Sequence, residues 1–155
     1  MDTNKNTVLS QVAEITLSYR PNSKMSDKPQ IVSSQSAAKV LRANWDESKL
    51  EFIEEFKVIL LNRANRVLGI VNASSGGTCG TVVDLKVIFA AAMKASASGI
   101  ILAHNHPSGT FRPSDQDNRL TEKMVKAGKL LDLPVMDHII LTAEGYYSFA
   151  DMGGL

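Results

Sequence analysis

The sequence contains little cysteine, no long hydrophobic run and almost no net charge. Its one cysteine, Cys79, excludes a disulfide within the chain and a cysteine-rich zinc site. The longest apolar runs, such as residues 87–93, are far too short to span a bilayer. Residues 1–12 also lack the long apolar core of a signal peptide. These absences predict a cytoplasmic protein that does not enter a membrane.

Positive and negative charges nearly cancel. The 17 basic and 16 acidic side chains leave a formal net charge of +1. Strong binding to nucleic acid depends on an excess of basic side chains, so this balance gives it little support. A hydrophobic content of 44% and a charged content of 21% are those of an ordinary globular protein. The 155 residues suffice for one domain with a buried core, and composition leaves the oligomeric state open.

Apolar residues recur with the periods of both strands and helices. The alternation over residues 12–20 is typical of a half-buried strand, and a polar, proline-bounded connector follows at 21–29. The later elements are expected, in chain order, to be a helix at 33–45, strands at 56–62 and 66–77, a helix capped by Asp84, a strand at 99–104, a helix after residue 114, and strands at 136–143 and 145–149. This order predicts an α/β fold in which helices flank a mixed β-sheet. We divide the chain into an N-terminal strand and connector (1–30) and a domain (31–155).

The two later helices are defined by apolar residues that recur every three or four positions. Their expected buried stripes are Leu85, Ile88, Phe89, Ala92 and Met93 in the first, and Leu120, Met124, Ala127 and Leu131 in the second. A glycine-rich bend at 76–81 precedes the first of these helices. We interpret Cys79, within this bend, as a small residue near a cleft rather than as a nucleophile.

Two of the three histidines, His104 and His106, stand one residue apart at the end of the strand at 99–104. Side chains at positions i and i+2 of a strand point to the same side, about 6 to 7 Å apart along the backbone. Two imidazoles placed in this way can bind one metal ion. Catalytic zinc takes three protein ligands and a water, and Asp117, on the first turn of the next helix, is well placed to be the third ligand. An isolated pair of this kind is more often incidental.

Ser114 and Asp117 also have a purely structural interpretation. A serine followed three residues later by an acidic residue, just before a helical stripe, is typical of a capping box. An aspartate near a helix N-terminus is favoured by the helix dipole as well. We therefore expect the pair to cap the helix, and this role is compatible with metal binding by Asp117.

The combined spacing is far more specific than the histidine pair alone. His104-x-His106, seven residues, Ser114, two residues and Asp117 resembles the H-x-H-x7-S-x2-D signature of the JAB/MPN (JAMM) metalloprotease-like domains. The run HNHPSG, together with Pro113-Ser114, Asp137-His138 and Tyr147-Ser148-Phe149, is similar to the RadC family within that group. This resemblance extends from about residue 30 to the C-terminus. The chain departs from longer RadC proteins by lacking their N-terminal helix-hairpin-helix region, so a DNA-binding role of that region is not carried over.

The resemblance implies a JAB/MPN, cytidine-deaminase-like architecture and a site with one zinc ion per chain. The ligands would be His104, His106 and Asp117, with a water in the open position, and Ser114 would stabilise the developing oxyanion. The family also has an upstream glutamate as general acid/base, two residues before a phenylalanine that opens a strand, and Glu54 fits this position better than Glu55. The implied activity is hydrolysis of an amide or isopeptide bond in a protein or peptide substrate.

Several other interpretations remain open at this point. The alternative to a hydrolase is a DNA-repair-associated protein that acts through DNA or protein partners, and a third class is a metal-bound interaction module with little catalysis. A zinc nucleobase deaminase would need a P-C-x-x-C motif, which one cysteine cannot supply. A non-haem iron oxygenase uses similar ligands but fits the serine spacing poorly. We expect His138 to be a hydrogen-bonded structural residue rather than a fourth ligand, and Asn105 to point away from the metal and fix the backbone.

Overall fold

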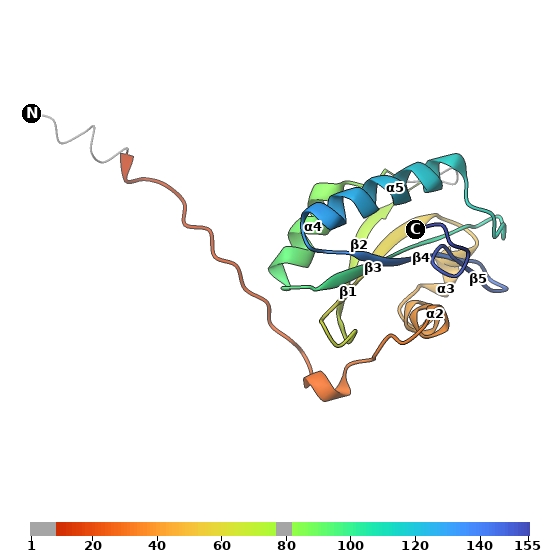
Figure 1. Cartoon of the computed structure of the whole chain (residues 1–155), viewed down its shortest axis with the longest axis horizontal. Helices are drawn as coiled ribbons and strands as arrows, with labels where there is room; N and C mark the ends of the chain where they lie inside the picture. Colours follow the sequence, from red (N-terminus) through yellow and green to blue (C-terminus); the bar gives the residue numbers. More distant parts are fainter. Residues whose placement is uncertain (1–8, 77–81) are drawn as a thin grey trace, which may run out of the picture.

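Five strands form one mixed sheet in the computed structural model, which describes residues 9–76 and 82–155 (Figure 1). The strands, in sheet order, are β2 (Val67–Ser75), β1 (Glu55–Leu61), β3 (Gly99–Asn105), β4 (Val135–Leu141) and β5 (Tyr146–Ser148). β3 and β4 run parallel, whereas the other neighbouring strands run antiparallel. The predicted α/β fold with a mixed sheet is therefore confirmed.

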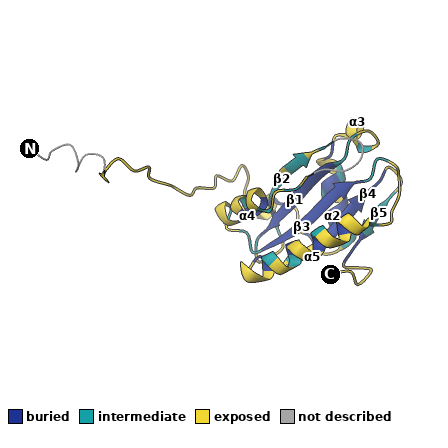
Figure 2. Cartoon of the chain, turned by 90° about the horizontal axis from the view of Figure 1, so that it is seen from above, coloured by how far each residue is buried: buried dark blue, intermediate teal, exposed yellow. Residues whose placement is uncertain are grey.

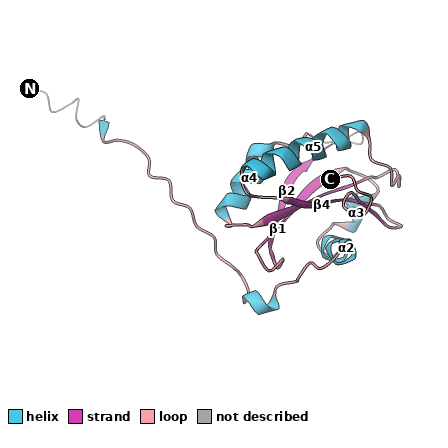
Figure 3. Cartoon of the chain, in the orientation of Figure 1, coloured by secondary structure: helices cyan, strands magenta, loops and turns pink. Residues whose placement is uncertain are grey.

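Helices cover both faces of the sheet (Figures 1 and 3). They are α2 (Ser34–Ala43), α3 (Glu47–Leu50), α4 (Leu85–Lys94) and α5 (Asp115–Leu130), and a short 3-10 helix, η1 (Met25–Asp27), precedes them. α4 and α5 lie on one face, and α2 and α3 lie on the other. Because both faces are covered, the central strands are buried on both sides, and their side chains are mostly apolar rather than alternating with exposed polar ones.

The sheet separates two apolar cores. Its strands are the most continuously buried part of the chain, whereas the helices are exposed on their outer sides (Figure 2). Ile101 and Ala103 of β3 face α2, and Ile100 and Leu102 face α4 and α5. This division follows from the period of two along a strand, which sends successive side chains to opposite faces. The same period decides which face of the sheet each residue at the end of β3 reaches.

The helices begin at the residues that cap them. Ser33 forms a capping box with Ser36 at the start of α2, and the Asp84 side chain accepts the Lys86 amide at the start of α4. Such caps each stabilise a helix by about 1 kcal/mol. Four of the nine expected stripe residues are buried and three are half-buried, but Met93 is 51% exposed and Leu131 is 42% exposed. Their predicted burial was wrong, because α4 packs on β2 at the sheet edge and α5 ends before Leu131.

The strand predicted at residues 12–20 does not form, and every residue of this segment is exposed. A strand needs a hydrogen-bonded neighbour, and the start of β2 is bordered instead by the chain at Pro29, whose carbonyl accepts the Val67 amide at 2.9 Å. The 12–20 segment extends away from the sheet (Figure 1), and Tyr19 donates a hydrogen bond to the Leu68 carbonyl at 2.7 Å. Its alternation is therefore not evidence of pairing within this sheet.

Two further sequence predictions concern the glycine-rich bend with Cys79 and the absence of a membrane-spanning helix. Cys79 and most of the glycine-rich bend at 76–81 lie outside the described residues. In residues 9–76 and 82–155, no helix combines the length and apolar character that crossing a lipid bilayer requires.

The connection from β3 through α5 to β4 positions the residues of interest. It joins two parallel neighbours, so the end of β3 and the start of α5 meet at the carboxyl edge of the strands, where ligands commonly bind in α/β sheets. Gly128 allows the return from α5 to be tight, because a Cβ there would collide with the carbonyl oxygen of Leu133. The Leu133 amide donates to the Gly128 carbonyl at 2.8 Å in this turn.

Candidate metal centre

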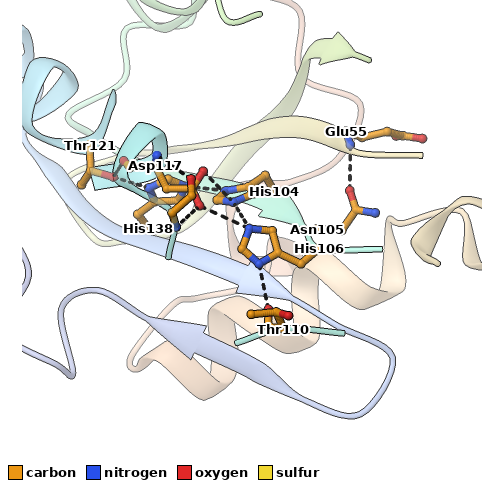
Figure 4. Close-up of polar contacts among 9 residues, drawn as sticks. Glu55, His104, Asn105, His106, Thr110, Asp117, Thr121 and His138 are labelled. Carbon is orange, nitrogen blue, oxygen red and sulfur yellow. Dashed lines mark hydrogen bonds and ion pairs between the residues drawn. The ribbon is translucent and has the colours of Figure 1, made fainter. Parts of the chain in front are cut away.

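His104, His106 and Asp117 form one cluster at the carboxyl edge of β3 (Figure 4). Nε2 of His104 lies 3.3 Å from Oδ1 of Asp117, and Nε2 of His106 lies 3.3 Å from Oδ2. The two Nε2 atoms are 3.0 Å apart, and ligand atoms from the three residues all lie within 4.8 Å of one another. The structure thus brings together the three residues that the sequence analysis assigned to a metal.

The histidines reach this place because of strand parity. His104 is the sixth residue of β3 and shares the α5 face with Leu102, and His106 follows directly after the strand. The His104 side chain is 1% exposed, and its ring stacks on Phe56 with the two planes 7° apart. His106 is more open, with its side chain 13% exposed. One histidine is therefore embedded in the core and the other borders solvent.

Asp117 is held by the predicted capping box. The Ser114 amide donates to Oδ2 of Asp117 at 2.8 Å, and the Asp117 amide donates to Oγ of Ser114 at 3.1 Å. The same carboxylate faces the two histidines, so capping and ligation use one side chain orientation. Ser114 lies beside the cluster, but its contribution to catalysis stays a prediction.

The electrostatics of the cluster favour an anionic Asp117 and a protonated His106. Burial opposes ionisation of Asp117, but the imidazoles of His104 and His106, whose Nε2 atoms lie beside its carboxylate, hold the pKa of this carboxyl well below its usual range. Burial also opposes a charge on His106, yet its hydrogen bonds to Asp117 and to the Thr110 carbonyl raise the pKa of this imidazole. Positive charge between the Nε2 atoms and the carboxylate is therefore stabilised.

A hydrogen bond orients His106 toward the cluster. Its Nδ1 lies 2.7 Å from the carbonyl oxygen of Thr110. A carbonyl only accepts, so Nδ1 carries a proton and donates it. Nε2 is then the nitrogen with a lone pair in the neutral ring, and it faces Asp117. This is the tautomer that a metal ligand requires.

Glu54 precedes β1 and is half-buried next to the cluster. Burial raises the pKa of this carboxyl, and the negative charge of Asp117 adds to the increase, while both histidines act in the opposite direction. A raised pKa suits a group that must both take and give a proton. The position agrees with the sequence analysis, and the acid/base role stays a prediction.

Burial does not separate Glu54 from Glu55, because Glu54 is half-buried and Glu55 is buried. Glu55 is only 8% exposed. It points to the other face of the sheet, where its carboxylate lies 3.4 Å from Nζ of Lys57 and 3.7 Å from Nζ of Lys49. The two glutamates differ in the face they reach, and the α5 face is the one that holds the histidines.

Asn105 links the strand of the two histidines to the segment that carries Glu54. Its side chain is fully buried on the face away from the cluster. Oδ1 accepts the Glu55 amide at 2.7 Å, and Nδ2 donates to the carbonyls of Leu50 and Ile53, each at 2.8 Å. The expectation that Asn105 fixes the backbone is confirmed, and two of its bonds go to the residues on either side of Glu54.

His138 and Thr121 extend the cluster into the core. Nε2 of His138 lies 2.8 Å from Nδ1 of His104, and Nδ1 of His138 lies 2.6 Å from Oγ1 of Thr121. Burial, and then the nearby His104, lower the pKa of His138 well below its usual range. His138 is thus a hydrogen-bonded structural residue, as expected. Thr121 was missed, although its position four residues after Asp117 places both on one side of α5.

Two other motif residues, Asp137 and Ser148, form hydrogen bonds near the C-terminal end of the domain. The Ser148 hydroxyl donates to Oδ2 of Asp137 at 2.7 Å, and the Ala150 amide donates to Oδ1 at 3.0 Å. Burial raises the pKa of Asp137 in spite of these bonds. The bonds tie β4, β5 and the following turn together.

Comparisons with known proteins give a family match and several related sequences. Residues 31–154 match the model of the RadC-like JAB domain. A UPF0758 protein of Flavobacterium johnsoniae is 45% identical over 100 residues, which cover 64% of this chain and 44% of that protein. A UPF0758 protein of Porphyromonas gingivalis is 48% identical over 101 residues, with the same two shares. One of Caldanaerobacter subterraneus is 38% identical over 118 residues, covering 71% of this chain and 51% of that protein. The matched region is about half the length of these relatives.

Proposed function

The chain belongs to the RadC-like JAB domain family, and on that premise we propose that it is a zinc-dependent hydrolase that cleaves an amide or isopeptide bond in a protein or peptide. The observation that carries the proposal is the convergence of His104, His106 and Asp117 at a buried edge of the sheet. Two imidazoles and a carboxylate match the ligand set of catalytic zinc with three protein ligands.

The donor set fits one zinc ion per chain. His104 and His106 would bind it through Nε2, and Asp117 through its carboxylate, which the Ser114 amide already orients. Bound zinc would supply a Lewis acid that polarises a carbonyl and lowers the pKa of a water to about 7. The anionic carboxylate between two imidazoles supports a cation at this place rather than a neutral ligand.

The residues around the zinc ligands supply the remaining chemistry. Glu54, with its raised pKa, takes a proton from the attacking water and returns it to the leaving amine. Oγ of Ser114 accepts the Asp117 amide, so its hydroxyl proton is directed elsewhere and can stabilise an oxyanion. Phe56 and the core behind His104 keep that side of the cluster dry.

Elemental analysis and two pairs of variants test the proposal. Wild-type protein should hold about one zinc per chain, and His106→Ala should lose it. Glu54→Gln should keep zinc and lose hydrolysis of a fluorogenic panel of lysine-linked isopeptides. Glu55→Gln, on the opposite face, is the matched control and should keep both.

Folded wild-type protein that takes up no zinc would refute the proposal, and so would full hydrolysis by Glu54→Gln. Binding of duplex DNA that weakens with salt and survives removal of the metal would favour the DNA-associated alternative instead.

A further inference from the structure

We propose that Thr121 and His138 form a buried hydrogen-bond chain that fixes the tautomer of His104 and thereby makes its Nε2 a metal ligand. The inference rests on the proposed zinc site and adds two positioning residues to it. Neither residue belongs to the group of side chains whose ligand atoms converge. Both act through His104, which lacks the open surroundings of His106.

The direction of every hydrogen bond in this chain follows from its first member. Oγ1 of Thr121 lies 2.7 Å from the backbone carbonyl oxygen of Asp117, and that oxygen can only accept. The hydroxyl proton of Thr121 is therefore committed to Asp117. Oγ1 can then only accept from Nδ1 of His138, 2.6 Å away, so this nitrogen carries a proton.

The same reasoning continues to the metal ligand. With its proton on Nδ1, neutral His138 has a lone pair on Nε2, and this lone pair accepts from Nδ1 of His104 at 2.8 Å. The proton of neutral His104 is thus on Nδ1. Its Nε2 presents a lone pair to the space that it shares with His106 and Asp117 (Figure 4). The opposite tautomer would direct a proton into that space.

Burial makes the protein side chains, rather than water, decide the tautomer. Thr121 is 1% exposed, His138 is 0% exposed and His104 is 1% exposed. The His138 ring is also stacked on Phe149 at a centroid distance of 4.7 Å, which fixes the plane in which it accepts. Partners of this kind beyond the metal ligands set ligand orientation and basicity.

The chain also joins two of the ligands to each other. It starts at the carbonyl of Asp117 on α5, passes through Thr121 and His138, and ends at His104 on β3. Asp117 thus faces the metal position with its side chain and orders His104 with its backbone. A shift of α5 against the sheet would disturb both ligands together.

The first test reads the tautomers directly in the metal-free protein by 15N NMR of the imidazole rings. The chain has three histidines, so the signals can be assigned with single variants. We expect protons on Nδ1 of His104 and His138 and no proton on Nε2 of His138. A proton on Nε2 of His138, with none on Nδ1 of His104, would overturn the proposal.

The second test measures zinc affinity by competition with a chelator. Thr121→Val removes only the hydroxyl and should weaken zinc binding about 10- to 100-fold. Thr121→Ser keeps the hydroxyl and should restore most of the affinity. His138→Gln offers an acceptor and a donor in similar places, so it should lose less affinity than His138→Phe.

A buried threonine that takes no part in this series of hydrogen bonds provides the matched control. Thr142 is also 1% exposed, and its hydroxyl hydrogen-bonds within the turn at Gly145. Thr142→Val should lower stability without changing zinc affinity. Equal zinc affinity of Thr121→Val and wild type would refute the role of the hydrogen bonds through Thr121 and His138. Absence of zinc binding by the wild type would refute the zinc site itself, and the NMR assignment distinguishes the two failures.

Discussion

Replacing Asn105 by alanine should destabilise the protein strongly, although the residue binds neither metal nor substrate in the proposed mechanism. The substitution leaves three backbone groups without their partner, namely the Glu55 amide and the carbonyls of Leu50 and Ile53. The Glu55 amide is buried and bears the full penalty of an unpaired donor, about 1 to 3 kcal/mol. Water can reach the two carbonyls, which lie on half-buried residues, and their loss is smaller.

The sum is a loss of about 3 kcal/mol in the free energy of unfolding. Urea unfolding followed by tryptophan fluorescence measures it, and the midpoint should fall by about 1 to 2 M. Asn118→Ala is the control, because Asn118 is exposed on α5 and should change stability by less than about 0.5 kcal/mol. A loss at Asn105 no larger than that at Asn118 would refute the reasoning.

Asn105→Asp separates the acceptor from the donors. The aspartate can still accept the Glu55 amide, but at neutral pH its carboxylate lies against the carbonyls of Leu50 and Ile53, which also only accept. We expect a loss at least as large as that of the alanine variant. Part of the stability should return on acidification, because a protonated carboxyl can donate one bond.

Two further predictions concern pH. In metal-free protein, Asp117→Asn should reduce stability most between about pH 4 and the raised pKa of His106. The lowered pKa of Asp117 stabilises the folded state, and this stabilisation is lost as pH falls below the ordinary carboxyl range. The raised pKa of His106 also stabilises the folded state, and that stabilisation is lost as pH rises through this pKa. Thermal unfolding across pH measures this, and a constant difference at all pH values would contradict it. Zinc must displace the proton of His106, so zinc affinity should fall about tenfold per pH unit below that pKa, with proton release seen by calorimetry in buffers of different ionisation enthalpy. Affinity independent of pH in this range would contradict displacement of a proton.

Local sequence rules predicted much of the fold correctly. Capping by Asp84 and by Ser114 depends on residues within one helical turn, and the common face of His104 and His106 depends on the period of a single strand. These interactions are short-range, so they can be recognised without knowing what surrounds the element. The order of strands and helices followed for the same reason.

The segment at 12–20 shows where local rules end. Its alternation is as regular as that of a strand, yet it has no neighbour in the sheet. Whether a strand forms depends on hydrogen bonds to residues far along the chain, and these are absent from any local pattern. The choice between Glu54 and Glu55 also depends on tertiary packing. Glu54 is partly buried and Glu55 is buried, and the packing of α5 shows which face of the sheet carries the cluster.

The sequence alone suggested the three candidate metal ligands, because their spacing puts them at one strand end and one helix start and resembles the JAB/MPN signature. The tertiary structure decided which buried side chains fix the orientation of these ligands. Thr121 and His138 are 17 residues apart, and they meet because the parallel crossover lays α5 over β4. No local period relates a helix residue to a strand residue across such a connection. The hydrogen-bond chain to His104 therefore depends on the packing of α5 against β3 and β4.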